Sequence, residues 1–272
     1  MMRGGRVTSR DGTRLAYLEM GTGPTIVLVH GGLGTGLGWL AVAPILSRRY
    51  RLILLDRRAH GSSEPGRTPY SLEKEAEDVL GVCEATGPIA ALFGHSYGAV
   101  VALHAALNSR SGLIPRLILY EPPLPVDEPF GGAFKDEFRQ MVEAGDYEAS
   151  LIRYLPNFGT RREDVEALRT LPTWATIVAL APTAVAELEA VDAIGSGLER
   201  YRDLEMPTLL LLGSETPANL RNATNALAAA IPQARKVLLE GQAHHATVYA
   251  PELVAEQVVR FVSDSRLAQP DR

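Results

Sequence analysis

Short apolar runs alternate with longer segments of helical pattern along most of the chain. Runs of this length with almost no polar residue are typical of strands that are buried on both faces of a sheet. Helical segments between such strands predict a parallel sheet with helices on both faces. The runs stand at 25–30, 51–56, 89–93, 115–120, 208–212 and 236–239.

Two further strands are expected near the N-terminus, where the segments 7–9 and 13–19 flank Asp11-Gly12. This dipeptide between two strand-like segments is a signal for a hairpin. The pattern therefore predicts an α/β fold with a mostly parallel eight-stranded sheet.

The segment from about Pro125 to Tyr201 interrupts the alternation, because it holds helical pattern and no strand candidate. A helical block between two strands of a parallel sheet is expected to form a cap over the strand ends, where open α/β sheets bind ligands. We therefore expect a core from residues 1–124 and 202–272 and a cap from residues 125–201, inserted after the sixth strand. The expected cap helices lie at 134–143, 147–154, 163–170 and 174–189.

A pentapeptide of the form G-x-S-x-G stands at 94–98, between an apolar run and a helical segment at 99–107. A sharp connection from strand to helix is the setting of a nucleophilic serine. Gly94 and Gly98 lack the Cβ atoms that would keep the strand and the helix apart. The hydroxyl of Ser96 then stands clear of the sheet, and the N-terminus of the helix favours negative charge that develops beside it. The pattern predicts Ser96 as a nucleophile.

Together with this pentapeptide, four other motifs resemble those of the α/β-hydrolase superfamily, in the order of that family and over nearly the whole chain. They are His30-Gly31-Gly32, the turn at 56–63 with Ala59 where glycine is usual, Gly213-Ser214-Glu215, and Gly241-Gln242-Ala243-His244 with Pro251 seven residues further on. The resemblance implies an α/β-hydrolase fold and an esterase-like enzyme with a serine nucleophile.

The resemblance also implies a general base, because a serine hydroxyl attacks a carbonyl only when a base takes its proton. His244 is expected to be that base and later to protonate the leaving group. His245 is the alternative, and the spacings to Gly241 and Pro251 favour His244.

Two backbone N–H groups are expected to form the oxyanion hole. One is that of Tyr97, which follows the nucleophile, and the other is that of Gly32 in the loop after the strand at 25–30. Substrate contacts are expected from Gly31, Leu33, His95 and, in the cap, Trp174. Most of the other apolar residues of the cap are expected to form the core of the cap, and the alternative is that they line a pocket for the acyl or alcohol part of the substrate.

The acid of the triad has two candidates. Many members of the superfamily carry it as G-x-x-D after the strand that follows the cap, but here Thr216 stands at the position of the aspartate and Glu215 comes one residue early. Glu121 directly follows the strand at 115–120, and some members draw their acid from that strand end. We favour Glu121, because it ends a clear strand and Pro122-Pro123 would fix its exit direction.

Charge and composition limit the partners. The 272 residues include 27 lysines and arginines against 32 aspartates and glutamates, a net charge of −5. This balance indicates neither nucleic acid nor an anionic membrane as a partner, so we expect a small-molecule substrate. With no apolar run near the roughly 18 residues of a membrane span and no secretory signal, a cytoplasmic protein is expected. The oligomeric state stays open; an apolar cap surface could support a homodimer.

No metal and no cofactor are expected. His244 and His245 are adjacent, whereas a helical zinc pair is spaced four residues apart. The glycine-rich segment 31–38 lacks the G-x-G-x-x-G register of a dinucleotide site. Cys83 is the one cysteine, which excludes an intrachain disulfide, and it is expected to be buried in a helix.

These residues predict hydrolysis of a carboxylic ester of a small to mid-sized, partly apolar substrate through an acyl-enzyme. A serine nucleophile disfavours a haloalkane dehalogenase or an epoxide hydrolase, which need a carboxylate. Hydrolysis of a lactone, an amide or a carbon–carbon bond, cofactor-free perhydrolysis, and a biosynthetic lyase or cyclase remain alternatives, because the fold does not choose among them. Two hypotheses without enzymatic activity are a non-catalytic ligand receptor and an interaction protein. The Ser96–His244 pair disfavours the receptor.

Overall fold

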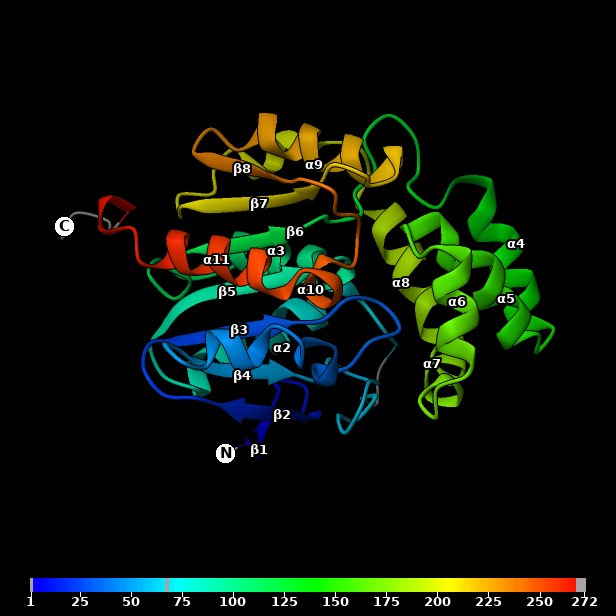
Figure 1. Cartoon of the computed structure of the whole chain (residues 1–272), viewed down its shortest axis with the longest axis horizontal. Helices are drawn as coiled ribbons and strands as arrows, with labels where there is room; N and C mark the ends of the chain where they lie inside the picture. The colour runs from blue at the N-terminus through cyan, green and yellow to red at the C-terminus, as the bar shows by residue number, and fades with distance from the viewer. Residues whose placement is uncertain (1, 67–68, 268–272) are drawn as a thin grey trace.

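The computed structural model describes residues 2–66 and 69–267. Its centre is one eight-stranded sheet with the strand order β1-β2-β4-β3-β5-β6-β7-β8 (Figure 1). The strands are β1 (Met2–Thr8), β2 (Arg14–Met20), β3 (Thr25–Val29), β4 (Arg51–Leu55), β5 (Ile89–His95), β6 (Leu117–Tyr120), β7 (Thr208–Gly213) and β8 (Ala234–Leu239). The predicted eight-stranded, mostly parallel sheet is confirmed.

Strands β3 to β8 run parallel, and β1 and β2 are antiparallel to their neighbours. The first strand begins at Met2 and not at residue 7, because its whole length pairs with β2, from Met2 opposite Met20 to Thr8 opposite Arg14. This pairing stabilises a segment whose glycines and arginines carry little strand signal of their own.

Helices cover both faces of the sheet, as the apolar runs predict. One face packs against α2 (Leu72–Ala85), α3 (Tyr97–Leu107) and α9 (Ala218–Ala230), and the buried Cys83 lies in this layer. The other face packs against α1 (Ala43–Leu46) and α11 (Pro251–Val262). Shorter helical segments are η1 (Gly36–Trp39), α10 (Ala246–Tyr249), η3 (Leu198–Tyr201) and η4 (Ser265–Leu267).

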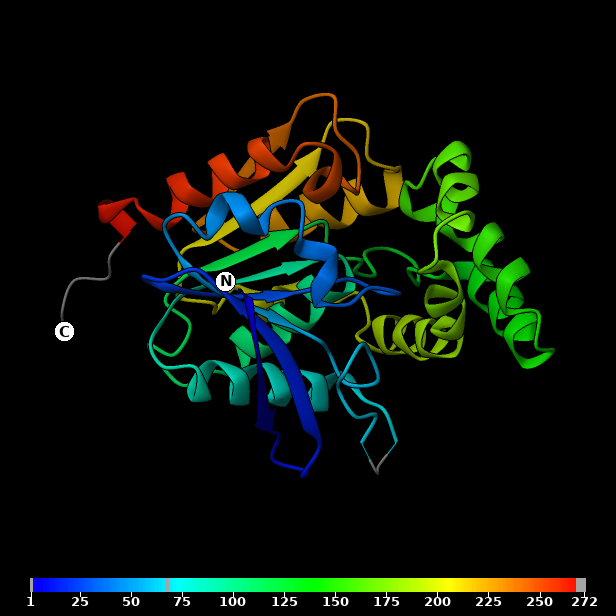
Figure 2. The same ribbon diagram turned by 60° about the horizontal axis from the view of Figure 1, so that its bottom comes forward.

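The helices between β6 and β7 form a separate group beside the ends of the strands, and we call α4 to α8 the cap. The arrowheads of the parallel strands point toward it (Figures 1 and 2). A buried cluster of its own, with Phe138, Leu151 and Leu188, holds the cap together. Its helices are α4 (Gly132–Glu143), α5 (Tyr147–Tyr154), η2 (Leu155–Phe158), α6 (Arg162–Arg169), α7 (Trp174–Ala179) and α8 (Ala181–Ala193).

One helix prediction in the cap is wrong. The segment 174–189 forms two helices, α7 and α8, with Leu180 between them. Pro182 stands in the first turn of α8, where its missing N–H costs nothing, whereas inside one continuous helix its ring would clash with the preceding turn.

Candidate active site

The G-x-S-x-G segment forms the turn between β5 and α3. Ser96 has φ 54° and ψ −127°, a backbone conformation that costs energy for a residue with a side chain. A Cβ on Gly94 would overlap the carbonyl oxygen of Gly98, and a Cβ on Gly98 would overlap that of His30. The glycines therefore let β5, α3 and the loop after β3 approach closely while the surrounding packing holds the strained serine.

His244 and Glu121 meet behind this turn, although 123 residues separate them in the chain. Nδ1 of His244 donates a hydrogen bond to Oε2 of Glu121 at 2.6 Å. The other carboxylate oxygen, Oε1, accepts hydrogen bonds from the N–H of Gly213 at 2.7 Å and from the hydroxyl of Thr216 at 2.5 Å. Both carboxylate oxygens are thus occupied, and the arrangement fixes the orientation of the imidazole.

Burial sets the charge state of this pair. Burial lowers the pKa of His244, so its imidazole is neutral at neutral pH, as a general base must be. Burial also raises the pKa of Glu121, and the hydrogen bonds from Thr216 and Gly213 oppose that rise. A second histidine stabilises the loop that carries His244. The ring of His95 hydrogen-bonds through Nε2 to the carbonyl oxygen of His244 at 2.8 Å.

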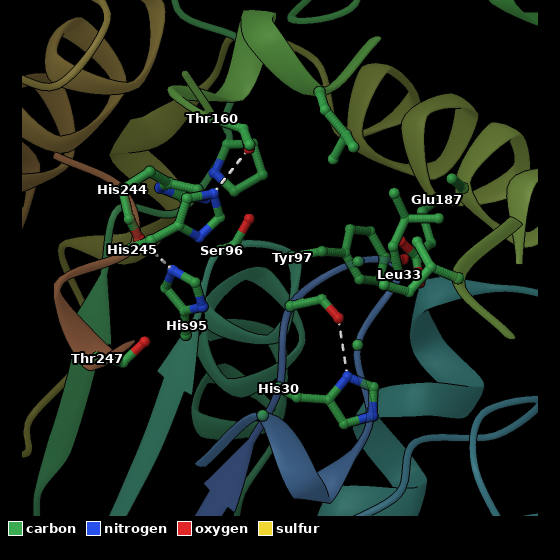
Figure 3. A pocket seen from close by; sticks show the side chains of 18 of the residues that line it. His30, Leu33, His95, Ser96, Tyr97, Thr160, Glu187, His244, His245 and Thr247 are labelled. Atoms are coloured by element: carbon green, nitrogen blue, oxygen red, sulfur yellow. Dashed lines mark hydrogen bonds between the residues drawn. The ribbon is translucent and has the colours of Figure 1, made fainter. Parts of the chain in front are cut away.

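The structure brings most of the predicted site residues to one cavity of about 340 Å³ between the strand ends and the cap. Figure 3 shows Ser96 pointing into it on the side where His244 and His245 lie. Between Ser96 and His244, both within the described part of the chain, no hydrogen bond is formed. Predicted residues that line the cavity are Gly31, Gly32, Leu33, His95, Ser96, Tyr97 and His244.

Three predicted residues lie elsewhere or act otherwise. Glu215 is exposed, and in the described part of the chain the carboxylate that hydrogen-bonds to His244 is that of Glu121. Trp174 does not line the cavity, contrary to expectation; it is buried in the cap cluster, and its Nε1 donates to Glu148 at 2.9 Å. His245 also lines the cavity, but its Nε2 hydrogen-bonds to the hydroxyl of Thr160 in the cap at 2.8 Å.

The loop after β3 is shaped to present N–H groups to the cavity. In the described part of the chain, the N–H groups of Gly32 and Tyr97 have no hydrogen-bond partner within the protein. A Cβ on Gly31 would lie 2.9 Å from the Cβ of Ser96, so a side chain here would push the loop away from the serine. Nδ1 of His30 bonds to the carbonyl oxygen of Gly31 at 2.8 Å and holds the loop in place (Figure 3).

Sequence reasoning missed a buried ionic cluster beside the cavity. Arg57 lies between Glu75 of α2 and Glu187 of α8, and all three side chains are almost fully buried. The guanidinium also lies over the ring of Tyr97, 4.8 Å from its centroid. In the sequence, the one indication of this cluster is the position of Arg57 in the turn at 56–63. The helical segment around Glu187 contains no motif that predicts a functional carboxylate.

Two further findings concern ligands and membranes. Within residues 2–66 and 69–267, no group of three or more histidine, cysteine, aspartate and glutamate side chains is placed to hold a metal ion. In the same residues, every helix is too short or too polar to span a bilayer.

The sequence model of the alpha/beta hydrolase family matches residues 26–257. The chain belongs to this family. A solved alpha/beta hydrolase from Sphaerobacter thermophilus is 32% identical and superimposes with a TM-score of 0.82, over 95% of this chain and 100% of that one. The predicted family and fold are confirmed, and this α/β-hydrolase is an enzyme of the superfamily.

Two relatives carry names that describe an activity. A pimeloyl-[acyl-carrier protein] methyl ester esterase from Aeromonas hydrophila is 29% identical over 257 residues, which cover 90% of this chain and 97% of that protein. A thermophilic esterase from Thermogutta terrifontis, solved with malate bound, is 25% identical with a TM-score of 0.76, over 98% of this chain and 100% of that one.

Proposed function

We propose that this α/β-hydrolase is a serine esterase that cleaves a carboxylic ester of a small to mid-sized, partly apolar substrate. The observation that carries the proposal is the hydrogen bond between His244 and Glu121, placed behind a cavity into which the strained Ser96 points. The names of the two esterase relatives support the same reaction class.

In the proposed mechanism, the neutral imidazole of His244 takes the proton of Ser96 as the oxygen attacks the ester carbonyl. Glu121 holds Nδ1 as the donor, so that Nε2 is the basic nitrogen, and stabilises the imidazolium that forms. Because the apo geometry of such pairs is often loose, the hydrogen bond between serine and histidine is expected to form when substrate binds.

The N–H groups of Gly32 and Tyr97 would stabilise the oxyanion of the tetrahedral intermediate. The imidazolium then protonates the departing alcohol, which leaves an acyl ester on Ser96. A water molecule, deprotonated by the same imidazole, hydrolyses this ester and returns the enzyme to its first state.

The size and the lining of the cavity support the proposed substrate class. A volume of about 340 Å³ lies at the lower end of the range for small-molecule sites. Apolar side chains from the cap, such as Ile177, Leu188 and Val191, line the cavity and would contact an aliphatic group.

The test is labelling with a fluorophosphonate, followed by intact mass spectrometry and peptide mapping. We expect one adduct on the wild type, mapped to Ser96, and no adduct on Ser96→Ala. His244→Ala should label at least about a thousandfold more slowly, because the base is lost. His245→Ala is the comparison for the neighbouring histidine and should still label.

An adduct that maps to another residue, or equal labelling of the wild type and His244→Ala, would contradict the proposed mechanism. Turnover is then measured on a panel of esters, lactones, amides and diketones. If a lactone, an amide or a carbon–carbon bond is cleaved faster than every ester, the proposed triad is retained and the proposed substrate class is wrong.

A further inference from the structure

Glu187 occupies an unusual place for a carboxylate, on the cap wall of the cavity and against the loop that is proposed to bind the oxyanion. It extends from α8 toward that loop, next to Leu33 (Figure 3). A Cβ on Gly32 would lie only 2.7 Å from Oε2 of Glu187. The carboxylate therefore borders the position where the carbonyl of a substrate would sit.

The two oxygens of Glu187 have different surroundings. Oε1 pairs with the guanidinium of Arg57 and lies 3.5 Å from Nε2 of His60. The residues that the structure describes form no hydrogen bond to Oε2, although the side chain is only 5% exposed. The ion pair between Oε1 and Arg57 is enough to join the cap to the core. Oε2 therefore remains available to a ligand in the cavity.

The charges around Glu187 do not balance. One guanidinium, that of Arg57, serves two carboxylates, because its Nη1 also donates to Glu75 at 2.8 Å. With both carboxylates ionised, the buried cluster carries one net negative charge. Burial raises the pKa of Glu187 to about 7, which reflects the cost of that charge.

The rest of the cavity offers nothing to compensate this charge. Among the described residues that line it, Glu187 is the only aspartate, glutamate, lysine or arginine. An ionised Glu187 also repels an oxyanion beside Gly32, since two like charges repel each other strongly where water is excluded. A positive group on the substrate would remove both penalties at once.

We propose that Glu187 determines specificity, and that the enzyme prefers esters whose acyl part carries a protonated amine close to the scissile carbonyl. The ammonium group would donate to Oε2, while the rest of the acyl chain contacts the apolar wall. The inference rests on the proposed esterase function, because it names the substrate class of the same cavity.

The test compares three methyl esters of nearly equal size. Methyl β-alaninate carries an ammonium group, methyl butanoate a methyl group in its place, and monomethyl succinate a carboxylate. Hydrolysis is followed by proton release at about pH 8, where a carboxyl group with a pKa of about 7 is ionised. The variant is Glu187→Gln, and the matched control is Glu189→Gln, which changes an exposed glutamate of the same helix that pairs with Arg139.

In the wild type and in Glu189→Gln, we expect kcat/KM for the ammonium ester to exceed that for the neutral ester about tenfold or more, as for one charge-assisted hydrogen bond. The anionic ester should be the poorest substrate. In Glu187→Gln the preference for the ammonium ester should fall to near one, and the anionic ester should improve relative to the neutral one.

A second measurement needs no variant, in case Glu187→Gln does not fold. The preference of the wild type for the ammonium ester should decline as the pH falls below about 7 and Glu187 takes up a proton. The arginine, histidine and tyrosines that face Glu187 keep their charge in this range. The two carboxylates raise the pKa of Arg57, burial lowers that of His60 to about 3, and burial raises those of Tyr70, Tyr97 and Tyr154. Burial also raises the pKa of Glu75, and the positive charge of Arg57 opposes that rise.

The outcomes separate this inference from the proposed function. Labelling of Ser96 and hydrolysis of the esters with no preference for the ammonium ester, or with the same preference in Glu187→Gln, would overturn the role of Glu187 and leave the esterase in place. If Ser96 is not labelled and no ester is cleaved, the esterase proposal fails. Calorimetric titration with propylammonium then decides on Glu187, and binding that is absent, or equal in the wild type and Glu187→Gln, overturns the inference.

Discussion

Two buried glutamates belong to the surroundings of the cavity, Glu187 on its cap wall and Glu121 behind His244 on the core side, and they are held in opposite ways. Behind the core wall, both oxygens of Glu121 are occupied by His244, Gly213 and Thr216. On the cap wall, Glu187 pairs through one oxygen with an arginine that it shares with Glu75, and its other oxygen faces the cavity. A fully bonded carboxylate orients its partners, whereas a half-bonded one keeps a hydrogen-bonding site for a ligand.

The core wall and the cap wall also differ in how well the elements behind them are packed. The core wall is built from the ends of central strands that are buried along their whole length, such as β6 and β7. The cap wall rests on a smaller cluster of helices with several half-buried members. In the proposed mechanism, catalytic geometry thus comes from the part of the molecule with more buried packing, and substrate choice from the part with less packing behind it.

The strongest way to test the core wall is to remove the charge of its carboxylate. Glu121→Gln should lower kcat for ester hydrolysis roughly a thousandfold or more, because an amide favours the wrong tautomer of His244 and does not stabilise the imidazolium. The measurement is steady-state turnover, with circular dichroism to confirm the fold.

Glu215→Gln is the matched control for this change, since Glu215 is the other acidic residue expected at a strand end and lies exposed. Its turnover should stay within a few-fold of the wild type. Equal, near-wild-type rates in both variants would exclude both glutamates as the acid.

The cap is expected to be the easier wall to destabilise. Phe138 is fully buried in the cap cluster and stacks on Tyr154 at 4.5 Å. Phe138→Ala should cost about 3–5 kcal/mol of local stability through the cavity that it leaves. Hydrogen exchange should accelerate in α4, α5 and α8 and change little in β5 and β6; uniform acceleration in both regions would argue against a cap that opens separately.

The charge on the cap wall should make stability depend on pH. The pKa of Glu187 is raised from 4.5 to about 7, so the folded state binds more protons than the unfolded state between these values. Its contribution to the free energy of unfolding is therefore full below about pH 4.5 and is lost as the pH rises through about 7, by up to about 3 kcal/mol.

Denaturation at a series of pH values measures this dependence, with Glu187→Gln as the comparison. The variant should lack this part of the slope and should gain stability relative to the wild type as the pH rises. Parallel curves for the two proteins would show that Glu187 is not the group that titrates.

The smallest effect is expected from Thr216, which donates one of the hydrogen bonds to Glu121. Thr216→Val keeps the shape of the side chain and removes the hydroxyl, which should raise the pKa of Glu121 further and reduce kcat about tenfold, or about 1–2 kcal/mol. Turnover unchanged by Thr216→Val, with a large effect of Glu121→Gln, would mean that Gly213 alone positions the carboxylate.

The sequence predicted those elements whose signal is local. Apolar runs marked the central strands because a strand buried on both faces needs no polar residue. It failed where distant partners decide: β1 extends to Met2 because β2 pairs with it, and Trp174 turns into the cap cluster because its indole finds Glu148 there. The break at Leu180 was readable from Pro182 and was missed.

By itself, the sequence determined the α/β architecture, the helical cap between two strands and the serine turn at 94–98, because periodicity and glycine spacing act over a few residues. Only the tertiary structure decided which glutamate contacts His244 and that Glu187 faces Gly32. Those contacts join residues more than 100 positions apart, and their geometry depends on how the strand ends and the cap pack together.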